Sequence, residues 1–165
     1  MLEVIRLDAT AAVRYAEIWA FGRNPAYADF DGMGGDCTNF ISQCIHAAGA
    51  AMNLTRDVGW YYRSLEDRAA AWTGVEFFYR FIVGNRGVGP FGREIGIGET
   101  QVGDVIQLGD ETGFYHSLLV TDLIDGQPYV AAHTADAFDR PLYSYFFDRM
   151  RVIAVRYARC ERRMS

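Results

Sequence analysis

The chain has 165 residues, 50% of them hydrophobic and 15% aromatic, which is enough for a buried core and argues against a disordered segment. It carries 16 basic and 21 acidic residues, every basic one an arginine, for a net charge of −5. This mildly acidic balance repels phosphate backbones, and we expect no nucleic-acid partner. No apolar run reaches the roughly 18 residues that a membrane span needs.

The N-terminal residues MLEVIR lack the basic segment and apolar stretch of a secretory signal. We therefore expect either a cytoplasmic protein or a domain of a longer secreted one. The length predicts a single domain over residues 1–165. The sequence leaves the compartment and the oligomeric state open.

The first third of the chain is predicted to be helical. Asp8 or Thr10 can cap a first helix that runs to about residue 20. Residues 21–36 then form an irregular stretch with five glycines or prolines, and loops of this length are uncommon unless they are functional. A second helix is predicted over residues 37–48, with Gly49 as its stop.

The middle of the chain is rich in aromatic side chains and glycines. Trp60, within the segment GWYY, is a candidate wall of a substrate groove, and core packing is the alternative. Thr73 can cap a third helix over residues 74–83. Residues 84–98, with six glycines, are expected to form a loop.

The C-terminal third is predicted to be a sheet. Its β-rich runs are separated by turn residues and cover residues 102–108, 115–124, 129–133 and 152–157. Asp104 is expected to anchor a turn. Helices followed by strands indicate an α+β domain with N-terminal helices on a mostly antiparallel sheet.

The segment GGDCTNF, residues 34–40, contains the candidate nucleophile. Asp36 can cap the second helix, which places Cys37 in its first turn, where free backbone N–H groups and the helix dipole favour a thiolate. The same turn, with Asp36 and Thr38, is a candidate for binding the oxyanion or the substrate. Because the Asp36 carboxylate raises the pKa of a neighbouring thiol, a cationic imidazole partner is needed. The alternative is a small buried residue at a helix start.

The other cysteines have structural interpretations. Cys44 falls on the buried stripe of the second helix, about 10 Å along the axis from Cys37 and so beyond disulfide reach. Cys160 lies in a polar tail. We expect three free thiols, with His46 at the surface.

A predicted hairpin supplies the candidate base and its orienting group. Asp125-Gly126 is a strong two-residue turn signal, and it pairs Ile124 with Gln127. In that register His116 and His133 are diagonal neighbours on one face, about 7 Å apart at the backbone. His116 is then the base and His133 the third member. A shift by one residue would place Asp136 beside His116 instead.

Several segments together resemble the putative amidase domain family of bacterial proteins. They follow one another along the chain as residues 24–27 (NPAY), 35–44 (GDCTNFISQC), 59–62 (GWYY), 103–107 (GDVIQ), 115–117 (YHS) and 132–134 (AHT). The resemblance spans roughly residues 8–145. This family is similar to CHAP and NlpC-type cysteine amidases and peptidases, which implies a papain-like fold and the roles of nucleophile, base and orienter for Cys37, His116 and His133. No Gln precedes Cys37 as an oxyanion donor, which leaves Tyr27 or a loop N–H for that role.

The resemblance implies cleavage of an amide bond, often in peptidoglycan stem peptides, without a metal or organic cofactor. The expected partner is a peptide or amide substrate. Three alternatives stay open: a non-catalytic binding module of the same fold, a zinc site made of Cys37, His116 and His133, and a transamidase that passes the acyl group to an amine.

Overall fold

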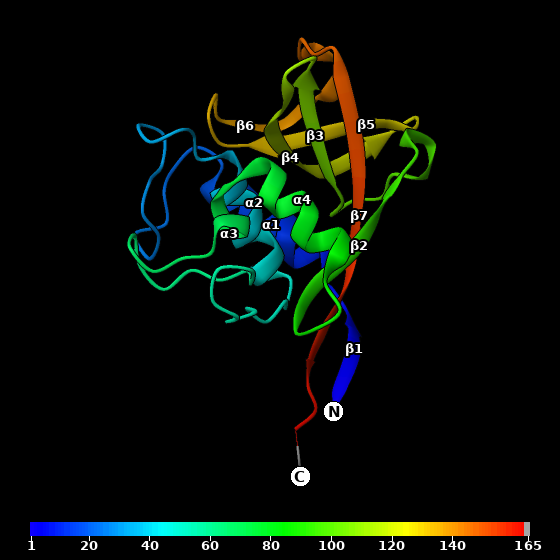
Figure 1. Cartoon of the computed structure of the whole chain (residues 1–165). Coiled ribbons are helices and arrows are strands. Elements are labelled where there is room, and N and C mark those ends of the chain that lie inside the picture. Colours follow the sequence, from blue (N-terminus) through cyan, green and yellow to red (C-terminus); the bar gives the residue numbers. More distant parts are fainter. Residues whose placement is uncertain (164–165) are drawn as a thin grey trace.

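The computed structural model describes residues 1–163, in which the helices lie on one side of a strongly twisted sheet (Figure 1). In chain order the elements are β1 (Leu2–Arg6), α1 (Ala9–Trp19), α2 (Cys37–Ala47), α3 (Ala70–Thr73), α4 (Val75–Gly84), β2 (Gly89–Ile95), η1 (Ile97–Glu99), β3 (Val105–Asp110), β4 (Gly113–Ile124), β5 (Gln127–Ala132), β6 (Ala137–Pro141), η2 (Leu142–Ser144) and β7 (Arg149–Glu161). None of these helices combines the length and apolarity needed to cross a bilayer.

The seven strands described within residues 1–163 form one sheet in the order β1-β7-β3-β4-β5-β6, with β2 also on β7. Every strand pair is antiparallel. The long strand β7 holds the sheet together, since β2 lies along one edge and β3 and β1 follow each other along the other. The α+β class with a mostly antiparallel sheet is confirmed.

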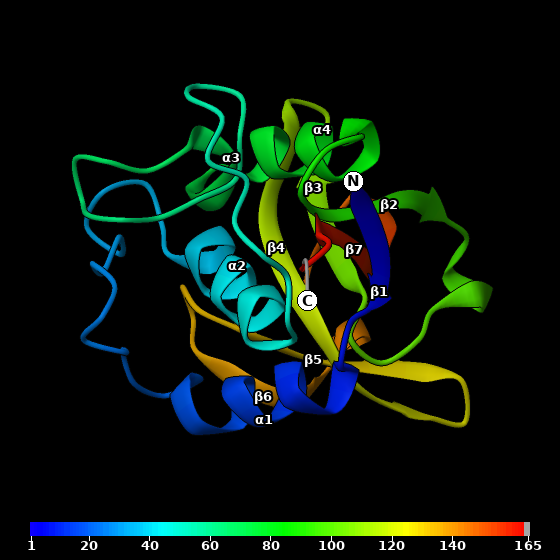
Figure 2. The same ribbon diagram turned by 90° about the horizontal axis from the view of Figure 1, so that it is seen from below.

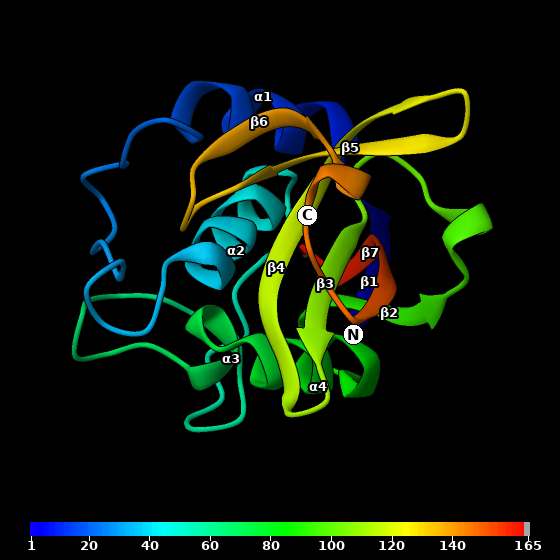
Figure 3. The same ribbon diagram turned by 90° about the horizontal axis from the view of Figure 1, so that it is seen from above.

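Strand alternation divides the core between the two faces of the sheet. Val105, Leu119 and Ala131 point to the helices, and their neighbours Ile106 and Leu118 belong to a second apolar cluster on the opposite face. The helix α2 lies between α1 and α3 (Figure 2) and runs beside β4 (Figure 3). It is therefore enclosed on most sides, and residues 37–45 are all buried.

The first two helices begin and end where their sequences predict. Asp8 caps α1, and its side chain accepts a hydrogen bond from the Ala11 amide at 3.1 Å. Gly49 follows α2 with a φ of +110°, a conformation that stops a helix at low cost in glycine. Thr73, the predicted cap of α4, instead closes α3, and Gly74 is the N-cap.

The prediction of a loop over residues 84–98 is wrong, because this segment contains β2. Its glycines do not prevent a strand, since β2 is held by its pairing with β7. Gly92 lies at a register shift where a Cβ would stand 1.7 Å from the Ala154 carbonyl oxygen. Glycine is required there because the two backbones approach closely.

The aromatic residues after α2 belong to the core. Trp60 is fully buried, its ring centroid lies 4.5 Å from that of Trp72, and its indole N–H donates to the Ser42 hydroxyl at 3.0 Å. Tyr61 and Tyr62 are buried as well. Trp60 is therefore a packing residue, and its interpretation as a groove wall is wrong.

Asp104 anchors the turn before β3, as predicted, and also forms a buried ion pair. Its carboxylate accepts hydrogen bonds from the amides of Gln101 (2.9 Å) and Val155 (3.3 Å). The Arg156 guanidinium approaches it at 2.9 Å and 3.2 Å. The side chain of Asp104 is inaccessible to solvent, so these contacts replace its water completely.

We predict that Asp104→Ala lowers the free energy of unfolding by about 3–5 kcal/mol, because it leaves a partly buried guanidinium and two amides without their acceptor. Asp67→Ala is the matched control, since Asp67 pairs with Arg63 on the surface; its cost should stay below about 1 kcal/mol. Urea unfolding of both variants measures the difference. Equal costs for the two would contradict the assigned role of Asp104.

Candidate functional site

Cys37 is the first residue of α2 and is 6% exposed. Its sulfur lies 3.8 Å from the Thr38 hydroxyl and beside the Ser117 backbone, which favours its thiolate. Burial raises the pKa of the Cys37 thiol, and the Asp36 carboxylate raises it further, whereas the contacts with Ser117 and Thr38 act in the opposite direction. The thiol is therefore protonated in this structure near neutral pH.

Asp36 occupies the N-cap position of α2, but its side chain does not cap the helix as expected. One carboxylate oxygen accepts hydrogen bonds from the Phe30 amide and the Asn39 side chain, both at 2.9 Å. The other lies 2.5 Å from Nδ1 of His133. Asp36 thus ties the loop before α2 to the helix and to the end of β5.

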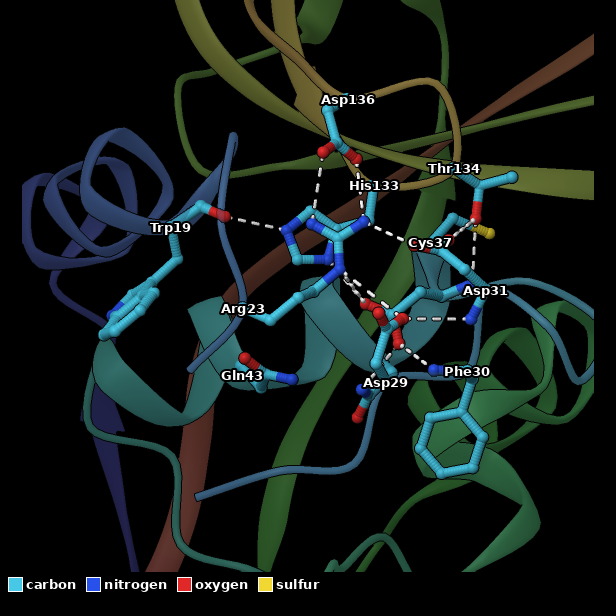
Figure 4. A network of polar contacts seen from close by, with 12 residues as sticks. Trp19, Arg23, Asp29, Phe30, Asp31, Cys37, Gln43, His133, Thr134 and Asp136 are labelled. Atoms are coloured by element: carbon cyan, nitrogen blue, oxygen red, sulfur yellow. Dashed lines mark hydrogen bonds and ion pairs between the residues drawn. The ribbon is translucent and has the colours of Figure 1, made fainter. Parts of the chain in front are cut away.

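His133 is held by two oxygen atoms, as Figure 4 shows. Its Nδ1 faces Asp36, and its Nε2 donates to the Trp19 carbonyl at 2.8 Å. The ring stacks on Phe40 with centroids 3.9 Å apart and is buried. A carbonyl oxygen can only accept, so Nε2 carries a proton, and neither ring nitrogen is left for a further partner.

The expected pairing of His116 with His133 is not formed, because the register of the hairpin changes. Ile124 does pair with Gln127, as predicted, but a bulge between Val120 and Asp122 shifts the pairing by one residue. Strand β5 then ends at Ala132, and His133 turns toward Asp36. The two histidines therefore lie on opposite faces of the sheet, and His133 does not orient His116.

The alternative orienter, Asp136, is also placed elsewhere. It forms an ion pair with Arg23 at 2.9 Å. The same guanidinium contacts Asp29, Asp31 and Asp36 at 3.5, 2.5 and 3.7 Å (Figure 4). Sequence reasoning missed Arg23, although three Asp residues shortly before a helix start, Asp29, Asp31 and Asp36, indicate that a cation lies nearby.

The turn after β5 is strained beside this cluster. Thr134 and Ala135 have φ values of +59° and +63°, a region that residues with a Cβ rarely adopt. The Thr134 hydroxyl accepts a hydrogen bond from the Asp36 amide at 2.8 Å and donates to Asp31 at 3.0 Å. These bonds hold the turn against the start of α2, where the Cys37 sulfur lies (Figure 4).

His116 lies in β4 opposite Leu108, on the face that carries Leu118 and Val120. Its ring centroid is 5.9 Å from that of Tyr145. Burial, and to a smaller extent the Arg140 guanidinium, lowers the pKa of His116 to about 4, so its imidazole is neutral near pH 7. Within residues 1–163 its ring nitrogens make no hydrogen bond, whereas His46 and His133 each bond a backbone carbonyl.

The Cys37 sulfur lies near the backbone of His116. Within residues 1–163 it makes no hydrogen bond with the His116 side chain. The amide that contacts the sulfur belongs to Ser117, and its nitrogen is bonded to the carbonyl carbon of His116. Strand β5 pairs with β4 only from Leu119 onward, so the backbone at residues 116–118 has no β5 partner on that side. The sulfur lies at this part of β4.

The other candidates differ in their distance from the nucleophile. Thr38 contacts Cys37 and bonds the Ser117 hydroxyl at 3.0 Å. Tyr27, the candidate oxyanion donor, packs in the aromatic cluster, with its ring 5.1 Å from that of Tyr62 and 5.9 Å from that of Trp72. It makes no hydrogen bond to Cys37 in the part of the chain that the structure describes.

The three cysteines are free thiols, as predicted, with Cys44 buried in the core. His46 is exposed, also as predicted. Among residues 1–163 no group of three or more His, Cys, Asp or Glu side chains is arranged to hold a metal ion. Cys37, His116 and His133 therefore do not form the zinc site that was one alternative.

Comparison with known proteins assigns the chain to a family. The model of the family described as "Putative amidase domain" matches residues 6–156. A protein of Bacillus subtilis (strain 168), described as "Uncharacterized protein YhbB", is 33% identical over 156 residues, which cover 92% of this chain and 49% of that protein. The chain thus spans about half the length of this curated relative. No solved structure matches it. Because the family match extends over most of the sequence, the chain belongs to the Putative amidase domain family.

Proposed function

We propose that the protein is a cysteine-dependent amidase that hydrolyses an amide bond through a thioester, on a single papain-like domain over residues 1–165. The observation that carries the proposal is the place of Cys37. Its sulfur lies at the start of α2, against the backbone of Ser117. The residue before Ser117 is His116, whose ring nitrogens make no hydrogen bond within residues 1–163. Membership of an amidase family supports an acyl-transfer reaction.

In the proposed reaction the Cys37 thiol gives its proton to His116, and the thiolate attacks the amide carbonyl carbon. Backbone N–H groups in the first turn of α2 stabilise the oxyanion. The C–N bond breaks, the amine leaves with the proton from His116, and a thioester remains. Water that gives a proton to His116 then attacks the thioester, and the acid and the thiol are released.

Two rearrangements belong to this proposal. The His116 side chain turns around the open part of β4 to reach the sulfur, because strand alternation otherwise directs it to the opposite face. Substrate reaches the buried sulfur by displacing the loop of residues 21–36 or the turn at Thr134. Opening either segment breaks contacts of Arg23 or Thr134 with Asp31 and Asp36, and the binding energy of the substrate has to offset that cost.

Asp36 and His133 have a positioning role in this scheme. Their contact fixes the first turn of α2, and it leaves the imidazole of His133 without a free nitrogen for proton transfer. The substrate class that we propose is a peptide amide, with peptidoglycan peptides as the first candidates because of the resemblance to CHAP and NlpC-type amidases. The identity of the substrate decides in which compartment the protein acts and whether it has a further partner.

The proposal predicts that Cys37→Ala abolishes turnover of peptidoglycan fragments and simple amides, because the substitution removes the sulfur atom that forms the thioester. Cys44→Ala is the matched control: it removes a buried thiol seven residues further along α2, and it should retain turnover if folded. Identification of the acyl product, a free acid or a new amide, with and without an added acceptor amine, measures hydrolysis and transfer separately. Equal turnover by the native chain and Cys37→Ala would end the proposal.

The neutral imidazole of His116 predicts a specific pH dependence of stability. The pKa of His116 is about 4 in the folded protein and 6.5 for an unperturbed histidine in the unfolded chain, so between these values the unfolded chain binds more protons. Stability from this group is therefore complete above pH 6.5 and is lost as the pH falls toward 4, by about 2 kcal/mol at pH 4.5.

His116→Gln should remove this loss. Urea unfolding near neutral pH and at about pH 4.5 tests it, with His46→Gln as the control because His46 is exposed. We expect the native chain and His46→Gln to lose about 2 kcal/mol more than His116→Gln on acidification. The same loss in all three proteins would contradict a buried neutral imidazole at position 116.

A further inference from the structure

We propose that Arg151, Gln107, Ser117 and Thr38 form a one-directional hydrogen-bond chain that ends at the Cys37 sulfur and stabilises its thiolate. The inference rests on the proposed function of Cys37 as nucleophile and adds four positioning residues to it. None of the four needs to touch the substrate.

Cross-strand pairing brings the first three residues into one row. Gln107 of β3 lies opposite Arg151 of β7 and opposite Ser117 of β4. Directly paired residues point to the same face of a sheet, and here that face is the one covered by α2 and α4. Thr38, in the first turn of α2, reaches the end of the row with its hydroxyl 3.0 Å from that of Ser117.

The row is buried and fully connected. Gln107, Ser117 and Thr38 are inaccessible to solvent. The side chain of Arg151 is 8% exposed, and its guanidinium lies over the rings of Tyr79 and Phe114, at 3.5 and 3.9 Å. Glu76 binds it at 2.8 Å from the surface side. A buried polar group costs free energy unless its bonds are satisfied, so each member depends on the next.

The direction of the hydrogen bonds follows from the Arg151 guanidinium, which can only donate. Two Arg151 nitrogens donate to the Gln107 side-chain oxygen at 2.7 and 2.9 Å, which fixes the orientation of the amide. Its nitrogen must then donate, and it does so to the Val75 carbonyl at 3.0 Å and to the Ser117 hydroxyl at 3.1 Å.

The two hydroxyls complete the chain. Ser117 accepts from Gln107, so its own proton is left for Thr38. Thr38 accepts that proton, and its hydroxyl is left to donate to the Cys37 sulfur at 3.8 Å. Within residues 1–163 neither hydroxyl has another hydrogen-bond partner. All protons therefore point from the guanidinium to the sulfur, and each bond polarises the next.

The Thr38 hydroxyl favours the thiolate, whereas the nearest charge to the sulfur opposes it. Asp36, on the N-terminal side of α2, disfavours a thiolate. Arg23 from the loop faces that carboxylate and offsets part of its charge, and His133 from the end of β5 contacts it as well. His116 on β4 is neutral near pH 7, and it adds no charge. The hydrogen-bond chain is thus one of the few contributions that favour ionisation of the Cys37 thiol.

The sharpest test is Gln107→Glu, which keeps the shape of the side chain. The carboxylate still accepts from Arg151 but cannot donate, so Ser117 and Thr38 reverse and the sulfur loses its donor. We expect the pH midpoint of Cys37 alkylation by iodoacetamide to rise by about one unit, and the rate near neutral pH to fall about tenfold. The modified thiol is identified by mass spectrometry.

Variants of Thr38 test the last step without a change of charge. Thr38→Val has the same shape and no hydroxyl, and it should raise the midpoint in the same way. Thr38→Ser retains the hydroxyl and should restore the native midpoint. If Gln107→Glu does not fold, Ser117→Ala interrupts the chain at the next residue. Unchanged midpoints in the folded variants would refute the chain.

The outcome separates this inference from the proposed function. Turnover lost in Cys37→Ala with unshifted midpoints in the other variants overturns the hydrogen-bond chain alone. Turnover retained in Cys37→Ala overturns the nucleophile itself, whatever the midpoints. Shifted midpoints together with loss of turnover in Cys37→Ala support both.

Discussion

The contact between Asp36 and His133 is the constraint on which the candidate site depends. These residues are 97 positions apart, and their 2.5 Å contact joins the start of α2 to the end of β5. The same carboxylate binds the Phe30 amide and the Asn39 side chain, so it also closes the preceding loop. The position of Cys37, the next residue in the chain, is fixed as a consequence.

The cost of burying a carboxylate explains the charges around it. An unpaired buried charge is strongly destabilising, and Asp36 is compensated by His133, by two N–H donors and by Arg23 at 3.7 Å. Asp31 lies beside it; partial desolvation opposes its ionisation, but hydrogen bonds from Arg23 and Thr134 prevail and lower its pKa. The contacts of Arg23 with Asp31 and Asp136, and of Thr134 with Asp31, hold the loop of residues 21–36 to the turn that follows β5.

The sulfur of Cys37 lies between opposing influences. Burial and Asp36 disfavour its thiolate, whereas the Ser117 backbone and the Thr38 hydroxyl favour it. In this structure the Cys37 thiol is protonated, and the His116 imidazole is neutral and directed to the other face of the sheet, so no thiolate–imidazolium pair stands ready before the reaction. The sheet contributes to this balance through its register, which aligns Arg151, Gln107 and Ser117 across three strands.

Local sequence determined the features that depend on near neighbours. Asp8 and Gly49 bound α1 and α2 as predicted, since capping involves residues within one turn. The Asp125-Gly126 turn and the pairing of Ile124 with Gln127 were also predictable, because both residues adopt the positive φ that such a turn needs. The free thiols and the burial of Cys44 followed from composition and helical spacing.

Only the tertiary structure decided the partners of the histidines and the course of β2. The bulge near Thr121 moves His133 out of the predicted register, and Thr121 is held there by Asp139 of the following strand. No pattern within the hairpin contains that information, because the contact is formed outside it. Strand β2 is rich in glycine and becomes a strand only against β7, more than fifty residues later in the chain. Such long-range contacts decide register and partners, whereas local propensity decides only which segments can become helix or turn.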